Sequence, residues 1–431
     1  AKHLAAALQT MPVSIEYPHQ QFLSHIHFQN ITQLNLSENY IGHEGAKYLA
    51  AAFQTMPVSI EYPHQQFTIH KSYSLSGITQ LNLYRSGFGD EGAKHLAAAL
   101  QTMPVSIEYP HQQFLSHIHF QNITQLHLSS NNISDEGAKY LAAALQTMPV
   151  SIEYPHQQFL SHVPFQNITQ LNLSWNGIDD EGAKYLADAL QTMPVSIEYP
   201  HQQFLSHIHF QNITQLHLSS NNISDEGAKY LAAALQTMPV SIEYPHQQFI
   251  SHIHFQNITR LNLYHNGFGH EGAKHLAAAL QTMPVSIEYP HQQFLSHIHF
   301  QNITQLHLSS NNISDEGAKY LAAALQTMPV SIEYPHQQFL SHIHFQNITQ
   351  LHLSSNNISD EGAKYLAAAL QTMPVSDWIS HTEFTSYVHF QSITQVDLSW
   401  NQINKAMENE LRNLMKSHKN GAFLRVHVDD Q

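Results

Sequence analysis

One sequence motif recurs along almost the whole chain. It reads Ile-Thr-(Gln or Arg)-(Leu or Val)-x-Leu, and it begins at Ile31, Ile78, Ile123, Ile168, Ile213, Ile258, Ile303, Ile348 and Ile393. The copies are 45 residues apart, except that the first interval is two residues longer. Self-similarity at a fixed period indicates a stack of one supersecondary unit instead of separate globular domains. The 431-residue chain is therefore expected to fold as a repeat array.

The apolar residues at the start of each unit have the period of a strand. In the copy that begins at Ile123, Leu126 and Leu128 alternate with the polar residue His127. This alternation is typical of a strand with one buried face. Asn131 follows where the chain is expected to turn.

A helix is expected next in each unit. Ser134 can cap it, and two carboxylates in the first turn complement the positive end of the helix dipole. Leu141 and Leu145 are four residues apart and share one face, and three alanines between and beside them favour the helix. Pro149 is expected to end it. Stacked copies would bury the apolar side that a single unit leaves exposed.

The spaced residues of this unit form a pattern that is found in a known family. In the copy at Ile123 they are Leu126, Leu128, Asn131, Ile133, Gly137, Leu141 and Leu145. The pattern resembles the ribonuclease-inhibitor-like class of leucine-rich repeats, which is also seen in NOD-like receptors, Ran GTPase-activating proteins and bacterial effectors. The resemblance implies an α/β solenoid with one parallel strand and one helix per repeat. It also implies protein binding on the concave side.

The repeat is longer than the roughly 20 to 29 residues usual for such repeats. The extra stretch lies between the helix and the next strand, and in it Val150, Ile152 and Tyr154 alternate with polar residues. The alternation predicts a short additional strand in each repeat, away from the concave sheet. We expect Phe159 and Phe165 to be buried beside these strands.

The repeat positions divide the chain into three parts. Residues 1–30 are expected to form a partial repeat with a truncated start, because the chain opens in the middle of the repeated sequence. Residues 31–403 are expected to form the solenoid with nine strand units. Residues 404–431 are expected to form a cap, since a more polar helix from Lys405 and an alternating segment from Phe423 replace the repeat.

Composition excludes several classes of partner and site. The chain has no cysteine, so disulfides and thiolate metal sites are absent. Its formal charge is −15 with neutral histidines, and no cluster of Lys and Arg suits nucleic acid or anionic membranes. No apolar run approaches the ~20 residues of a membrane span. The compartment stays open between the cytoplasm and secretion from a bacterium, as an effector or surface protein without disulfides.

Two motifs suggest cofactor or zinc chemistry but fail in detail. Gly87 to Gly92 read G-x-G-x-x-G, yet sibling repeats carry other residues in the same register, and Asp90 would repel a pyrophosphate. His270 and His275 are five residues apart, whereas a zinc-binding helix places histidines four apart. We find no nucleophile elbow, and therefore predict no enzyme activity and no cofactor.

Abundant histidines leave a metal-binding alternative open. His117 and His119 would point the same way on a strand, and stacking would bring the next pair about 5 Å away. Such a column suits zinc or copper, or equally a hydrogen-bonded polar ladder that responds to pH. Pro164 interrupts the column in one repeat.

The copies of the repeat differ mainly at three positions on the expected concave face. These are the residue between the two core leucines, the residue two later, and the one after that. Exposed aromatics and arginine are typical interface anchors. The candidate protein-binding residues are Tyr84, Arg85, His127, Trp175, His217, Tyr264, His265, His307, His352, Asp397 and Trp400.

These observations favour a scaffold that binds a protein partner, which could be a second copy of the chain, through the concave face. The first alternative is a self-assembling structural or filament component, because several repeats are identical in sequence. The second alternative is a histidine-rich metal-binding or pH-responsive module.

Overall fold

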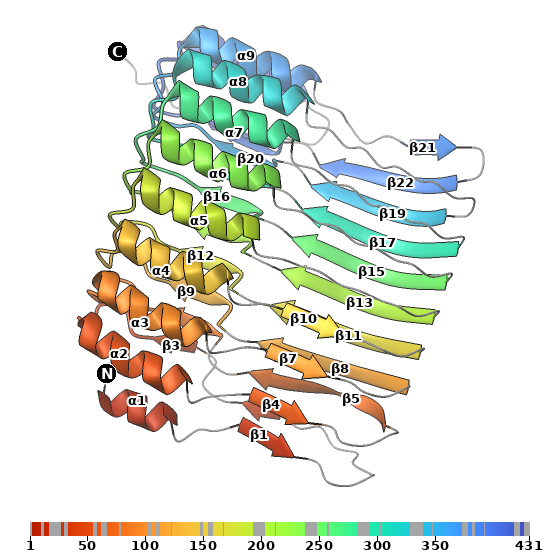
Figure 1. The fold of residues 1–431 in the computed structure, drawn as a ribbon. Coiled ribbons are helices and arrows are strands. Elements are labelled where there is room, and N and C mark those ends of the chain that lie inside the picture. The colour runs from red at the N-terminus through yellow and green to blue at the C-terminus, as the bar shows by residue number, and fades with distance from the viewer. Residues whose placement is uncertain are drawn as a thin grey trace.

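Each repeat contributes one helix to a single stacked layer in the computed structural model of the chain (Figure 1). The structure describes residues 2–9, 13–16, 27–29, 33–54, 58–61, 67–76, 79–101, 105–108, 113–121, 123–146, 150–153, 158–166, 168–192, 203–211, 213–237, 248–256, 258–282, 293–301, 303–327, 339–346, 348–372, 378–381, 384–391, 393–417 and 423–425. The helices are α1 Lys2–Gln9, α2 Gly42–Gln54, α3 Gly89–Gln101, α4 Asp135–Gln146, α5 Asp180–Thr192, α6 Asp225–Thr237, α7 His270–Thr282, α8 Ser314–Thr327, α9 Asp360–Thr372 and α10 Lys405–Ser417.

The recurring motif forms a parallel sheet of three-residue strands, which we call the short-strand sheet. Neighbouring repeats pair in register, so that Leu171 lies opposite Leu126 and Leu216. Its strands are β3 Gln33–Asn35, β6 Gln80–Asn82, β9 Gln125–His127, β12 Gln170–Asn172, β14 Gln215–His217, β16 Arg260–Asn262, β18 Gln305–His307, β20 Gln350–His352, β23 Gln395–Asp397 and β24 Phe423–Arg425. One strand and one helix per repeat confirm the predicted α/β solenoid.

A second sheet runs beside the first and is built from the extra residues of each repeat. We call it the long-strand sheet; Figure 1 shows it continuing outward from the helical part. Its strands are β2 His27–Gln29, β5 Phe67–Ser76, β8 Gln113–Gln121, β11 Gln158–Gln166, β13 Gln203–Gln211, β15 Gln248–Gln256, β17 Gln293–Gln301, β19 Phe339–Gln346 and β22 Phe384–Gln391, with antiparallel β21 Trp378–His381 at the edge. Only the backbone of these strands is described.

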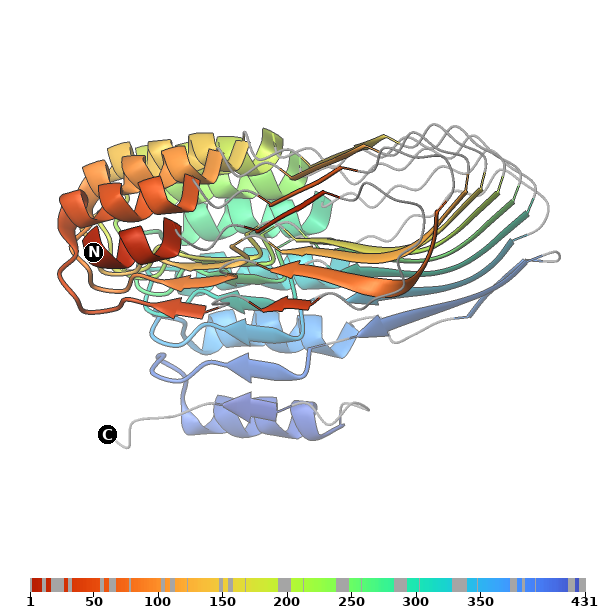
Figure 2. The ribbon, with the colours of Figure 1, turned by 90° about the horizontal axis from the view of Figure 1, so that it is seen from below.

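The predicted additional strand is present in four repeats of the described chain. It forms the parallel pairs β1 (Val13–Glu16) with β4 (Val58–Glu61), and β7 (Val105–Glu108) with β10 (Val150–Glu153). Figure 2 shows these strands on the helix side of the long-strand sheet. The inserted residues of these repeats form two strands: the predicted short strand and then the long strand, which runs in the opposite direction (Figure 1). Only the first of these two strands was predicted from the sequence. Phe159 and Phe165 lie on that long strand, β11. Their side chains lie outside the described residues, so their burial beside the short additional strands stays a prediction.

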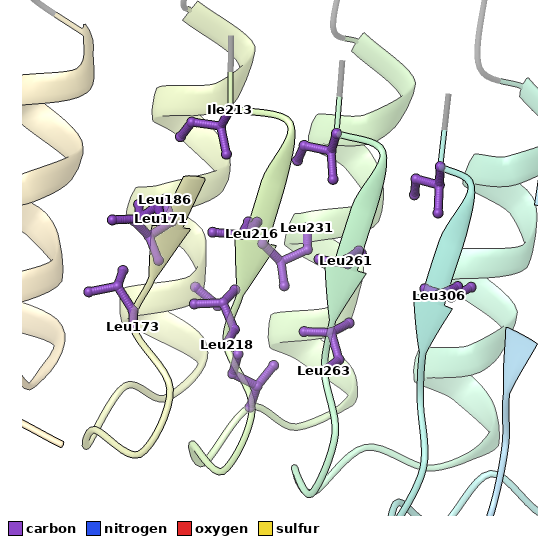
Figure 3. Close-up of a cluster of buried hydrophobic side chains, with 14 of the residues drawn as sticks. Leu171, Leu173, Leu186, Ile213, Leu216, Leu218, Leu231, Leu261, Leu263 and Leu306 are labelled. Carbon is purple, nitrogen blue, oxygen red and sulfur yellow. The ribbon is translucent and has the colours of Figure 1, made fainter. Parts of the chain in front are cut away.

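The core fills the space between the short-strand sheet and the helices. Figure 3 shows part of this core, with Leu171 and Leu173 of one repeat in the same cluster as Leu186 of helix α5. The alternating leucines and the helical leucines four residues apart are buried in each repeat from Ile123 to Leu370, together with alanines on the same helix face. This pattern agrees with the strand and helix periods of the sequence.

A ladder of asparagine side chains fixes the turn after each short strand. Asn131 is fully buried, and its amide donates to the carbonyls of Leu83, Leu128 and Ser129. Its side-chain oxygen accepts from the Ser86 amide of the preceding repeat. Equivalent bonds recur at Asn176, Asn221, Asn266, Asn311, Asn356 and Asn401. The polar backbone of the turn is therefore satisfied inside the core.

An aspartate of one helix caps the helix of the next repeat. The Asp90 carboxylate of α3 accepts from the backbone amides of Ser134 and Gly137, at 2.8 and 3.1 Å, and from the Ser134 hydroxyl. The Ser134 hydroxyl also accepts weakly from Glu136, as expected for an N-cap. A Cβ at Gly137 would lie 2.5 Å from the Asp90 oxygen, which explains the glycine in the repeat. The carboxylate thus does more than complement its own helix dipole.

Candidate interaction face of the short-strand sheet

One face of the short-strand sheet is covered by helices, and the other carries the side chains that alternate with the buried leucines. Leu126 and Leu128 are buried, whereas His127 between them is half-buried. Alternate residues of a strand point to opposite sides of the sheet. We call the surface formed by the strand residues equivalent to His127, and by the two turn positions equivalent to Ser129 and Ser130, the open face.

Partly buried histidines form the floor of the open face toward its C-terminal side. The His307 and His352 rings are stacked, with centroids 4.0 Å apart and planes 11° from parallel. His352 Nδ1 lies 3.9 Å from an Asp397 carboxylate oxygen. Its buried Nε2 has no hydrogen-bond partner among the described residues. The predicted candidates His307, His352 and Asp397 are thus brought together.

The surroundings of these groups shift their pKa values. Burial, and next the charge of the neighbouring His352, lower the pKa of His307 to about 4. Burial raises the pKa of Asp397, but the adjacent His352 and the bonds from Ser399 outweigh it and lower the value to about 2. The pKa of His127 is lowered by burial, and that of His217 is lowered by burial and by the charges of His127 and Arg260. These shifts favour the neutral form of His127, His217 and His307.

Large side chains also occur two residues after the histidine position, at the position of Ser129. Tyr264 is 42% exposed, and its ring lies 5.7 Å from that of His265. Tyr84 occupies the same position four repeats earlier and is half-buried. In other repeats a serine takes the place, and Ser129 and Ser219 are buried.

The third candidate position lies on a turn and not on a strand. Residues there have φ between 51° and 59°, the left-handed region, as seen for Arg85, Trp175, His265 and Trp400. Their amides still extend the pairing of the sheet, since Trp175 N–H donates to Ser219 O at 2.9 Å. The indole rings remain exposed, at 63% for Trp175 and 58% for Trp400. These residues therefore line the edge of the open face where the strands end.

Two residues of this region were missed from the sequence. Tyr40 is 83% exposed at a turn two residues after Glu38, and it stands where other repeats carry asparagine, glycine or glutamine. That departure was the available signal. Arg260 is exposed at the start of β16, where the other short strands apart from β24 begin with glutamine.

The alternative metal column falls on the long-strand sheet. His117 and His119 lie on β8, and the backbone register places His117 opposite His162, which pairs with His207. Their side chains lie outside the described residues. Within the part of the chain whose side chains are described, no three metal-ligating groups converge. In that part, no helix is long and apolar enough to cross a membrane.

The glycine-rich motif serves the turn before helix α3. Gly87 and Gly89 adopt φ values of 68° and 59°, which suit glycine. The Asp90 carboxylate at the helix start is committed to the next repeat, as described above. These roles agree with the interpretation that the motif is structural.

Comparison with known proteins identifies the repeat. The family described as Leucine Rich repeat matches residues 27–50, 119–142, 166–187, 209–232, 255–277, 299–322 and 344–367, each of which joins the end of a long strand, a short strand and most of a helix. No curated protein matches the chain. Leucine-rich repeats generally mediate protein–protein interaction, and proteins built from them are typically non-enzymatic scaffolds. With seven matched repeats on a stacked strand–helix solenoid, the chain is a leucine-rich-repeat protein.

Proposed function

We propose that the protein is an interaction scaffold that binds a partner protein through the open face, the concave face of the ribonuclease-inhibitor-like subtype. The observation that carries the proposal is the exposure of Trp175, Tyr264 and Trp400 along one edge of that face. Other repeats have serine at these positions, so the fold does not need an aromatic ring there.

The chemistry of this edge suits an interface. Tryptophan, tyrosine and arginine are the side chains that most often dominate binding energy, because they bury a large area and also donate hydrogen bonds. Arg85 stands beside Tyr84, and His265 beside Tyr264, so each pair joins a ring to a polar group. His127, His217 and His307, which are half-buried and whose pKa values are lowered, would form part of the floor under these anchors.

A photo-crosslinking experiment tests the proposal. A benzoylphenylalanine is placed at Tyr264, and the protein is incubated with extract of the cells in which it occurs. We expect a discrete crosslinked partner that disappears when Trp175 and Trp400 are both replaced by serine, their counterpart in sibling repeats. The matched control places the crosslinker at Tyr365, which is 37% exposed on helix α9. Equal crosslinking from both sites, or no effect of the serine variant, would contradict binding through the open face.

A further inference from the structure

Large side chains occur at every second repeat over part of the open-face edge. They are Tyr84 with Arg85, then Trp175, then Tyr264 with His265. The two repeats between them carry the serine pairs Ser129–Ser130 and Ser219–Ser220, which are buried or half-buried. The edge therefore alternates between large and small side chains across five strands.

The spacing of the rings follows from the sheet. Neighbouring strands lie about 4.8 Å apart, so residues two repeats apart are about 9.6 Å apart across the strands. Trp175 stands one residue further along its repeat than Tyr84 and Tyr264, at the turn position that Arg85 and His265 also occupy. A polyproline II helix rises about 3.1 Å per residue with three residues per turn, and presents the same side every ~9.3 Å. From Tyr84 to Tyr264 the sheet spans four intervals, ~19 Å, and six residues of such a helix span nearly the same length.

Other peptide conformations fit this spacing less well. An extended strand presents the same side every ~6.8 Å. Two turns of an α-helix rise ~10.8 Å, so a helix is out of step by more than 2 Å over the four intervals. The period of the rings thus selects the polyproline conformation.

The hydrogen-bonding groups at the edge are also complementary to such a ligand. Proline has no amide N–H, and a polyproline helix has no internal hydrogen bonds, so its carbonyls need external donors. The Tyr hydroxyls, the Trp175 indole N–H and the Arg85 guanidinium all donate. Proline rings pack against aromatic rings, and the preformed helix loses little entropy on binding.

We propose that the edge from Tyr84 to Tyr264 binds a proline-rich segment in the polyproline II conformation, running across the strands, with every third residue of the segment against Tyr84, Trp175 and Tyr264 in turn. The proposal rests on the proposed function, since it specifies which kind of partner segment the open face takes.

Binding of fluorescein-labelled decaproline, measured by fluorescence anisotropy, tests this inference. We expect saturable binding, and no binding of a glycine–serine peptide of the same length. Trp175→Ser and Tyr264→Ser should each weaken the affinity by about tenfold, as loss of an interface anchor does. Each introduces the residue found in sibling repeats, so folding, checked by circular dichroism, should persist.

Tyr365→Ser is the matched control. Tyr365 is an aromatic residue that is 37% exposed on helix α9, away from the open face. The variant should leave decaproline binding unchanged. Moving the ring by one strand, with Trp175→Ser plus Ser220→Trp, should not restore binding.

Three outcomes would overturn the inference: no decaproline binding, equal effects of Trp175→Ser and Tyr365→Ser, or recovery in the shifted variant. If the crosslinked partner is still lost in the serine variants while decaproline does not bind, the polyproline inference fails and the interaction scaffold stands.

Discussion

Replacing His270 by aspartate is expected to stabilise the start of helix α8. In the cap between α3 and α4, Asp90 accepts from two backbone amides of the next repeat, and equivalent contacts are made by Asp135, Asp180, Asp225, Asp315 and Asp360. His270 stands at this position before α8. There the Ser314 amide instead donates to Asn356 O at 2.9 Å, and Ser314 adopts a φ of 61°.

The expected gain follows from these differences. A carboxylate cap contributes about 1 kcal/mol. Release of a non-glycine residue from the left-handed region contributes about another 1 kcal/mol. The amide bond to Asn356 is exchanged for one to the new carboxylate, so we expect it to contribute little. His270→Asp should therefore stabilise this helix start by about 2 kcal/mol.

Hydrogen exchange is the suitable assay, because it reports local stability in a repeat array whose unfolding need not be two-state. The amides of residues 314–318 should exchange about 30-fold more slowly in His270→Asp, since each 1.4 kcal/mol corresponds to a factor of ten. Ser314→Gly alone should recover about half of the gain, because it removes only the strain.

His43→Asp provides the matched control. In the next repeat, Gly89 is the residue whose amide an aspartate at position 43 would cap. Its φ of 59° carries no cost for a glycine, and its amide donates to Asn131 O. The gain at helix α3 should be about 1 kcal/mol smaller than at α8. Unchanged exchange in His270→Asp, or equal gains at both sites, would refute the reasoning.

Two further predictions concern the asparagine ladder and His307. Asn311→Ala removes the side-chain bonds to the carbonyls of Leu263, Leu308 and Ser309 and leaves the backbone amide of Asn266 without its acceptor, so it should lower the local stability measured by hydrogen exchange by about 3 kcal/mol. Asn311→Ser should lower it less, because Ser86 at the same position of another repeat still donates to a carbonyl. A loss below about 0.5 kcal/mol in Asn311→Ala would contradict the role of the asparagine ladder. His307→Asn should make the stability of the protein less sensitive to acid. The pKa of His307 in the folded state is about 4, below its ordinary value, so the unfolded chain binds the proton more readily. The free energy of unfolding of the unmodified protein therefore falls as the pH drops from about 6.5 to 4. Urea denaturation of both proteins at pH 7.5 and 5 checks this, with asparagine already present at Asn262 of the same column as a precedent; an equal loss in both would contradict it.

The helices and short strands could be predicted because their signals are local. Leu126 and Leu128 alternate, and Leu141 and Leu145 are four residues apart, so each element can be read within one repeat. The long strand was less accessible. Its backbone partners lie a full repeat away, and the sequence between Tyr154 and Phe165 does not show where the chain turns back.

The role of the helix-start aspartates could not be read locally either. Asp135 was assigned to its own helix dipole, whereas its carboxylate bonds the amides of Asp179 and Gly182. The candidate residues of the open face were found because copies differ there. The turn conformation of Trp175 was not predicted, since its position was placed on the same face as the strand residues, whereas its φ of 55° puts it on the turn.

Distance measurement between spin labels tests the stacking of the repeats most directly. The chain has no cysteine, so His127→Cys with His307→Cys, and His127→Cys with His352→Cys, introduce single pairs four and five strands apart. If each repeat is one rung of a parallel sheet, the mean distances should be about 19 and 24 Å and differ by about 4.8 Å. An increment of about 10 Å or more, or broad unrelated distances, would show that the strands do not pair from repeat to repeat.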